Sequence, residues 1–158
     1  MSSAEPDALW RAAGRTRIRD TRVLRPLIGA RLGPNAPSGN TTFRRLFRTG
    51  IFTLLEEGDH YSISGVAGCL WSPRGDYAHF ESAADYRQYD RPGRAKAGVM
   101  TLVREHHRGS EIVTEIRVWC TDRSAEMRFR PVWMIVAPFM RFVRMELLRS
   151  VARRAESQ

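Results

Sequence analysis

The last third of the chain joins one long alternating segment directly to one long helical segment. Residues 111–121 read Glu-Ile-Val-Thr-Glu-Ile-Arg-Val-Trp-Cys-Thr, the alternation typical of a strand with two different faces. From about Ser124 to Glu156 the apolar residues recur every third or fourth position, which indicates an amphipathic helix. A strand that leads into a helix of this length favours an α+β fold in which a sheet packs against one C-terminal helix.

The middle of the chain predicts the rest of that sheet. Residues 51–56 and 60–71 flank a Gly-Asp turn and read as a hairpin, and residues 95–105 add a strand before 111–121. A short helix is expected at 81–88. Gly65 and Gly68 within the second strand indicate bending or a close approach of another backbone. We therefore expect a curved antiparallel meander of at least four strands.

Short helices are expected near the N-terminus. Pro6 suits the first turn of a helix that ends near Gly14, and residues 21–32 predict a second helix broken by proline and glycine. Residues 33–40 have the composition of a turn.

Two prolines interrupt the pattern of the C-terminal helix. Pro131 and Pro138 each remove a backbone donor, so this helix is expected to start late or to bend. Asp122 or Ser124 can cap its first turn.

Composition predicts one globular domain that spans residues 1–158. The chain has 42% hydrophobic and 27% charged residues, with a net charge of +9. Lys96 is the only lysine among 26 basic residues, and the positive field would attract phosphate groups. The two cysteines and the absence of a signal-peptide pattern predict a cytoplasmic protein. No uncharged stretch approaches the roughly 20 residues of a membrane span, so no transmembrane segment is expected.

Three stretches resemble bacterial members of the helix-grip (SRPBCC) superfamily, which includes polyketide cyclases, START lipid-transfer domains and birch-pollen-type allergens. They are residues 65–71 (Gly-Val-Ala-Gly-Cys-Leu-Trp), residues 91–97 (Arg-Pro-Gly-Arg-Ala-Lys-Ala), and residues 114–118 (Thr-Glu-Ile-Arg-Val) followed by Thr-Asp and the basic helix. The resemblance covers about residues 42–156. It implies a curved antiparallel sheet that grips the C-terminal helix and encloses a hydrophobic cavity.

This chain departs from the pattern of that superfamily in two places. Only five residues precede Pro6, so either the usual N-terminal strand is lost or the start codon has been placed too late. Loss of the strand would leave a sheet edge unpaired, which a homodimer or the glycine-rich loop at 33–40 could cover. Tyr61 stands where an acidic residue is expected four positions before Gly65.

Glu115 and Arg117 are the main polar candidates because alternation places them on one face of their strand. They would either orient a polar ligand group in the cavity or form an exposed pair on the convex face. The opposite face, which begins at Ile112, is more apolar and suits packing against the helix. The candidate ligand-binding residues are Tyr61, Trp71, Met100, Glu115, Arg117, Trp119, Trp133, Met134 and Met140.

Signatures of an enzyme are few, and no catalytic residue can be assigned. The histidines and cysteines have no metal-site spacing, and no nucleophile elbow or phosphate loop is present, so neither metal nor cofactor is expected. The leading hypothesis is binding or carriage of a small hydrophobic molecule, such as a lipid, polyketide or aromatic metabolite.

Two other hypotheses remain open. One is a cyclase or dehydratase that uses Glu115, Arg117 and Tyr61 in the same cavity. The other is association with anionic lipid or nucleic acid through basic residues of the C-terminal helix; nucleic acid is the less expected partner because recognition motifs are missing. The arginines concerned are Arg141, Arg144, Arg149, Arg153 and Arg154.

Overall fold

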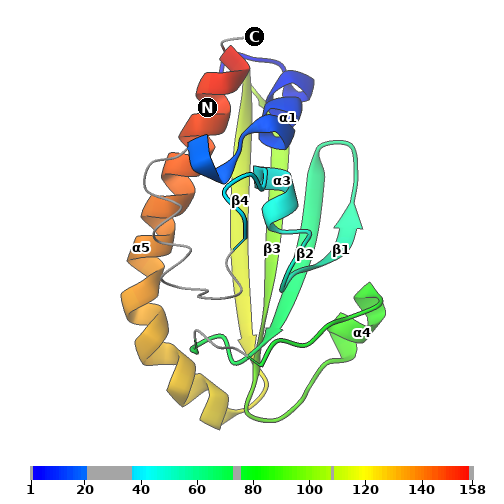
Figure 1. The fold of residues 1–158 in the computed structure, drawn as a ribbon, viewed down its shortest axis with the longest axis vertical. Helices are drawn as coiled ribbons and strands as arrows, with labels where there is room; N and C mark the ends of the chain where they lie inside the picture. Colours follow the sequence, from blue (N-terminus) through cyan, green and yellow to red (C-terminus); the bar gives the residue numbers. More distant parts are fainter. Residues whose placement is uncertain (1, 21–36, 73–75, 108, 157–158) are drawn as a thin grey trace.

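A four-stranded antiparallel sheet and one long C-terminal helix make up most of this α+β fold (Figure 1). The computed structural model describes residues 2–20, 37–72, 76–107 and 109–156. Along the chain the elements are α1 (Pro6–Arg15), a 3₁₀ turn (Ile18–Asp20), α3 (Phe43–Leu46), β1 (Thr53–Glu57), β2 (Tyr61–Gly68), α4 (Ala83–Gln88), β3 (Ala95–His106), β4 (Gly109–Cys120) and α5 (Arg123–Glu156).

The strands follow one another in the order β1-β2-β3-β4, and each pairs with the next. The meander predicted from the sequence is therefore confirmed, and the open sheet has β1 and β4 at its edges among the described residues. β2 ends three residues earlier than predicted, at Gly68. The φ of Gly68 is +149°, and a Cβ built on Gly68 would lie 2.4 Å from the carbonyl oxygen of Asp76. Glycine therefore allows the backbone to leave the sheet at this position.

The helix α5 begins directly after β4, at Arg123. Asp122 caps it, since one carboxylate oxygen accepts a hydrogen bond from the backbone N–H of Ala125 at 2.7 Å and the other accepts one from the N–H of Gly93. These bonds hold the pKa of Asp122 below its usual value.

Both prolines lie inside α5 and are exposed. Of the two expectations, a late start or a bend, the late start is not observed, because Pro131 and Pro138 are accommodated within the helix. The alternative expectation, a bend, agrees with the curvature of α5 in Figure 1.

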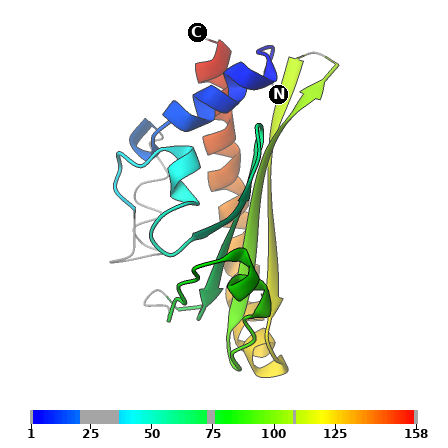
Figure 2. The ribbon, with the colours of Figure 1, turned by 90° about the vertical axis from the view of Figure 1, so that its right-hand side faces the viewer.

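The main core cluster lies at one end of the molecule, where α1, α3 and the end of α5 meet the β3–β4 hairpin. Its buried members are Leu9, Trp10, Ala12, Ala13, Ile18, Phe43, Leu46, Val103, Ile112, Val151 and Ala155. Figure 2 shows α1 and α5 on the same side of the sheet. The N-terminal helix predicted from Pro6 to near Gly14 is thus confirmed, and it packs against the C-terminal turns of α5.

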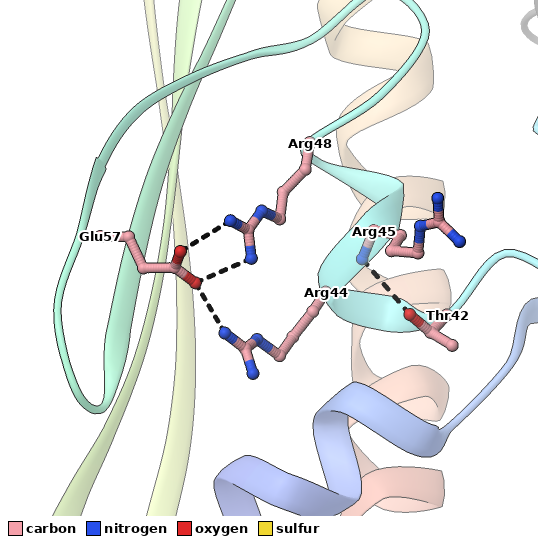
Figure 3. A network of polar contacts seen from close by, with 5 residues as sticks. All are labelled: Thr42, Arg44, Arg45, Arg48 and Glu57. Atoms are coloured by element: carbon pink, nitrogen blue, oxygen red, sulfur yellow. Dashed lines mark hydrogen bonds and ion pairs between the residues drawn. The ribbon is translucent and has the colours of Figure 1, made fainter.

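Two arginines of the segment around α3 bind one carboxylate of β1 (Figure 3). Arg44 Nη2 lies 2.6 Å from Glu57 Oε1, and Arg48 contacts both oxygens of Glu57 at 2.9 and 2.6 Å. The guanidinium of Arg44 also lies over the ring of Trp10, 4.6 Å from its centroid. The network therefore ties α1, α3 and β1 together.

The N-terminal residues contribute one bridge to the sheet. Ser2 and Ser110 exchange two backbone hydrogen bonds of 2.9 Å at the outer edge of β4. This pairing covers only the start of that edge, and in the described part of the chain no strand precedes α1. The predicted broken helix at 21–32 and the turn at 33–36 lie outside the described residues.

A candidate ligand-binding face of the sheet

The two faces of the sheet differ in what covers them. Val103 and Ile112 pair across β3 and β4 and pack with Val151 and Ala155 of α5, so their side of the sheet is its inner face. Residues at every second position belong to the same face. The inner face carries Ser62, Ser64, Val66, Ala95, Ala97, Val99, Thr101, Val103, Ile112, Thr114, Ile116, Val118 and Cys120.

Hydroxyl groups form a row across this inner face. Ser62 pairs with Thr101, and Thr101 pairs with Thr114, which places three hydroxyl-bearing residues side by side on β2, β3 and β4. Ser64 lies one row further, opposite Val99. All four hydroxyl residues are buried, with Ser64 only 1% and Thr114 5% exposed.

Two of these buried hydroxyls lack a hydrogen-bond partner. Within the described part of the chain, neither Ser64 Oγ nor Thr114 Oγ1 forms a hydrogen bond. A buried polar group without a partner costs about 1–3 kcal/mol of stability, which is why such groups are rare in folded proteins. The hydrogen-bonding capacity of these two hydroxyls is therefore not used by the described residues.

Few of the α5 side chains that the structure describes are buried, and these lie at the ends of the helix. Among the side chains of α5 that the structure describes, the buried ones are Ala125 near its start and Val151 and Ala155 near its end. These three residues attach both ends of α5 to the rest of the fold.

Most of the predicted polar site residues lie on the other, outer face. Glu115 and Arg117 form an ion pair with each other at 2.6 Å, and their side chains are 44% and 69% exposed. Tyr61 is on the same face, and its hydroxyl donates a 2.7 Å hydrogen bond to Glu56, which raises the pKa of Tyr61. Met100 lies opposite Glu115 in the register, and the predicted residue Trp119 is exposed.

The remaining predicted site residues lie elsewhere. Trp71 follows β2 and is half-buried. Trp133 stacks on Phe129 within α5 at 5.5 Å, and Met134 is 70% exposed. The side chain of Met140 lies outside the described residues. The structure therefore brings Tyr61, Met100, Glu115, Arg117 and Trp119 to one face but separates them from the α5 residues.

An aromatic cluster under α4 was not expected from the sequence. The ring of Tyr86 lies on Gly65, where a built Cβ would approach it to 2.6 Å, and Gly65 pairs with Gly98 across the sheet. Phe80 contacts Tyr86 and Tyr89 edge to face, with centroids 5.4 Å apart in each pair. Paired glycines on adjacent strands are the signal that could have predicted a ring at this position.

Burial has a direct electrostatic effect in this cluster. It raises the pKa of Tyr86 to about 12, and it also raises the pKa of Tyr89. Neither hydroxyl has a hydrogen-bond partner in the described part of the chain.

Neither a metal centre nor a membrane span emerges from the described residues. Among them, no three histidine, cysteine or acidic side chains are grouped as a metal ion would require. No helix in the described ranges has the length and apolar character needed to cross a bilayer. Comparison with known proteins gave no matching family model, no matching curated protein and no matching solved structure.

Proposed function

We propose that this protein binds a small, mostly apolar molecule between the inner face of the sheet and α5. The observation that carries the proposal is the pair of buried, unpartnered hydroxyls of Ser64 and Thr114. Binding sites for small molecules are mainly apolar and contain a few polar groups that fix the orientation of the ligand. The inner face, with small aliphatic side chains around a row of hydroxyls, has this composition.

The free-energy balance supports a ligand on this face. Each unpartnered hydroxyl destabilises the ligand-free protein by about 1–3 kcal/mol. A ligand oxygen or nitrogen within hydrogen-bond distance of Thr114 or Ser64 would remove that penalty. The ligand class we infer is a lipid, polyketide or aromatic metabolite with at least one hydroxyl, carbonyl or carboxyl group.

The arrangement of α5 supports a helix-grip relationship as part of this proposal. The helix follows the last strand directly, lies on the inner side of the sheet and is anchored at both ends (Figures 1 and 2). We infer that the sheet grips α5 and that the ligand lies beneath its middle. The free thiols of Cys69 and Cys120 support a reducing, cytoplasmic location.

Mass spectrometry of the purified full chain under native and then denaturing conditions tests the proposal. The expected result is a complex that releases one defined small mass on denaturation, or a protein that takes up one molecule from a panel of fatty acids, polyketides and aromatic acids. A ligand-free mass both before and after exposure to the panel would contradict it.

Two adjacent residues provide a matched pair of variants. Thr114 faces inward and Glu115 faces outward, so Thr114→Val is expected to weaken ligand uptake at least tenfold whereas Glu115→Gln leaves it unchanged. Loss of uptake in Glu115→Gln alone would place the ligand on the outer face. That result would contradict the proposal.

A further inference from the structure

Helix α5 carries a second apolar surface, which faces solvent. Five large apolar side chains of this helix are exposed. They are Met127 (63%), Met134 (70%), Ile135 (77%), Phe142 (51%) and Met145 (40%). At 100° per residue they fall within an arc of roughly 100° on the helix surface. We call these five residues the apolar stripe.

The ends of α5 fix the direction of the apolar stripe. The buried residues Ala125, Val151 and Ala155 lie on the opposite side of the helix and are packed against the rest of the fold. The helix cannot rotate about its axis to bury the stripe without exposing these anchors. The stripe is thus a permanent feature of the surface in the folded chain.

Arginines border the apolar stripe. Helix α5 contains eight arginines and three glutamates, so its formal net charge is +5. Helical geometry places Arg130 and Arg141 along one side of the stripe and Arg128 along the other, and all three are exposed. In the described part of the chain, Arg130 and Arg141 take part in no ion pair, so their charges are not compensated by a carboxylate there.

We propose that α5 docks lengthwise on the surface of an anionic lipid bilayer. The apolar stripe enters the interface between headgroups and acyl chains, and the bordering arginines contact lipid phosphates and carboxylates. Helices with an apolar stripe and a basic border bind membranes in this orientation without crossing them. Methionine and phenylalanine suit such a surface because they adapt to irregular apolar surroundings.

The apolar stripe favours lipid over nucleic acid as the partner. Nucleic acid would engage the arginines through its phosphates but would leave the five apolar side chains in water. A bilayer accommodates both features of the surface at once. This inference rests on the outer surface of α5, so it holds or fails independently of ligand binding on the inner face.

Sedimentation of the full chain with lipid vesicles tests the inference. Vesicles of phosphatidylcholine alone are compared with vesicles that contain 30% phosphatidylserine. We expect at least tenfold stronger binding to the anionic vesicles and a loss of most of that binding between low and high salt. Equal binding to both compositions, or binding to neither, would overturn the proposal.

Matched variants distinguish binding through the apolar stripe from non-specific binding through any exposed apolar or charged side chain. Ile135→Ser combined with Met134→Ser is expected to reduce vesicle binding at least tenfold, whereas Trp119→Ser, which removes an exposed apolar side chain from the sheet, has no effect. Arg130→Gln with Arg141→Gln should lower binding to anionic vesicles by a similar factor. Arg117→Gln is the charge control on the outer face.

Two other results would assign the surface to a different partner. Binding to DNA or RNA that is unaffected by the serine substitutions, with no vesicle binding, would indicate a nucleic-acid surface. A dimer in light scattering that dissociates on Ile135→Ser, again with no vesicle binding, would show that a second copy covers the stripe. Either outcome overturns the membrane proposal.

Discussion

Thr114→Val is predicted to stabilise the ligand-free protein while it weakens ligand binding. Thr114 is 5% exposed, and its hydroxyl has no hydrogen-bond partner in the described part of the chain. Valine has nearly the same shape, so the substitution removes an unsatisfied polar group and creates little cavity. The expected gain in unfolding free energy is about 1 kcal/mol or more, which corresponds to roughly 2–4 °C in Tm for a chain of this size.

Thr16→Val is the matched control for this prediction. The hydroxyl of Thr16 is also buried, but it donates a 2.9 Å hydrogen bond to the carbonyl oxygen of Ala12. Thr16→Val breaks this hydrogen bond, and the carbonyl oxygen of Ala12 loses one of its donors. We expect a loss of about 1 kcal/mol, the opposite sign from Thr114→Val.

Urea unfolding of the ligand-free protein, followed by circular dichroism, measures both effects. Protein that has been unfolded, stripped of bound molecules and refolded gives the reference state. The midpoint should rise for Thr114→Val and fall for Thr16→Val at an unchanged slope. If Thr114→Val lowers the midpoint as much as Thr16→Val does, the hydroxyl of Thr114 has a partner in the native protein and the reasoning fails.

Three further changes probe the rest of the fold. Backbone N–H groups lower the pKa of Asp122 in the folded state. Its contribution to stability is therefore present above the unfolded pKa of about 4 and is lost as the pH falls through the folded pKa. Asp122→Asn should flatten that part of an acid-unfolding curve. Glu57→Gln should destabilise the protein by about 1 kcal/mol in urea unfolding. A double-mutant cycle with Arg48→Gln should show positive coupling between the two side chains, and additive effects would contradict the bidentate contact. Gly65→Ala should cost roughly 1–3 kcal/mol in thermal unfolding because its methyl group meets the ring of Tyr86, and the cost should shrink in a Tyr86→Ala background.

The secondary structure was largely predictable from the sequence because its signals are local. Alternation identified β4, turn residues separated it from β3, and the spacing of apolar residues identified α5, all within about two residues of the observed bounds. Asp122 and Ser124 were both predicted as possible caps, and the structure shows that Asp122 is the cap. Of the two outcomes predicted for α5, a late start or a bend, the helix shows the bend (Figure 1), with Pro131 and Pro138 inside it.

The roles of individual residues were harder to predict, because they depend on what covers each face of the sheet. Alternation placed Glu115 and Arg117 on one face but gave no reason to choose between a cavity and solvent. The packing of Ile112 against α5 decides this and leaves the charged pair on the outer face. The hydroxyl row from Ser62 to Thr114 depends on the register of three strands, which no single segment encodes.

Alternation and turn chemistry in the sequence alone therefore determined the α+β class, the order of the strands and the position of the long helix. These signals depend only on residues that are close together in the sequence. The tertiary structure alone decided which face of the sheet is buried, which hydroxyls lose their hydrogen-bond partners and which side of α5 faces solvent. These properties arise from contacts between distant segments, such as α1 with the end of α5, and they locate both proposed surfaces.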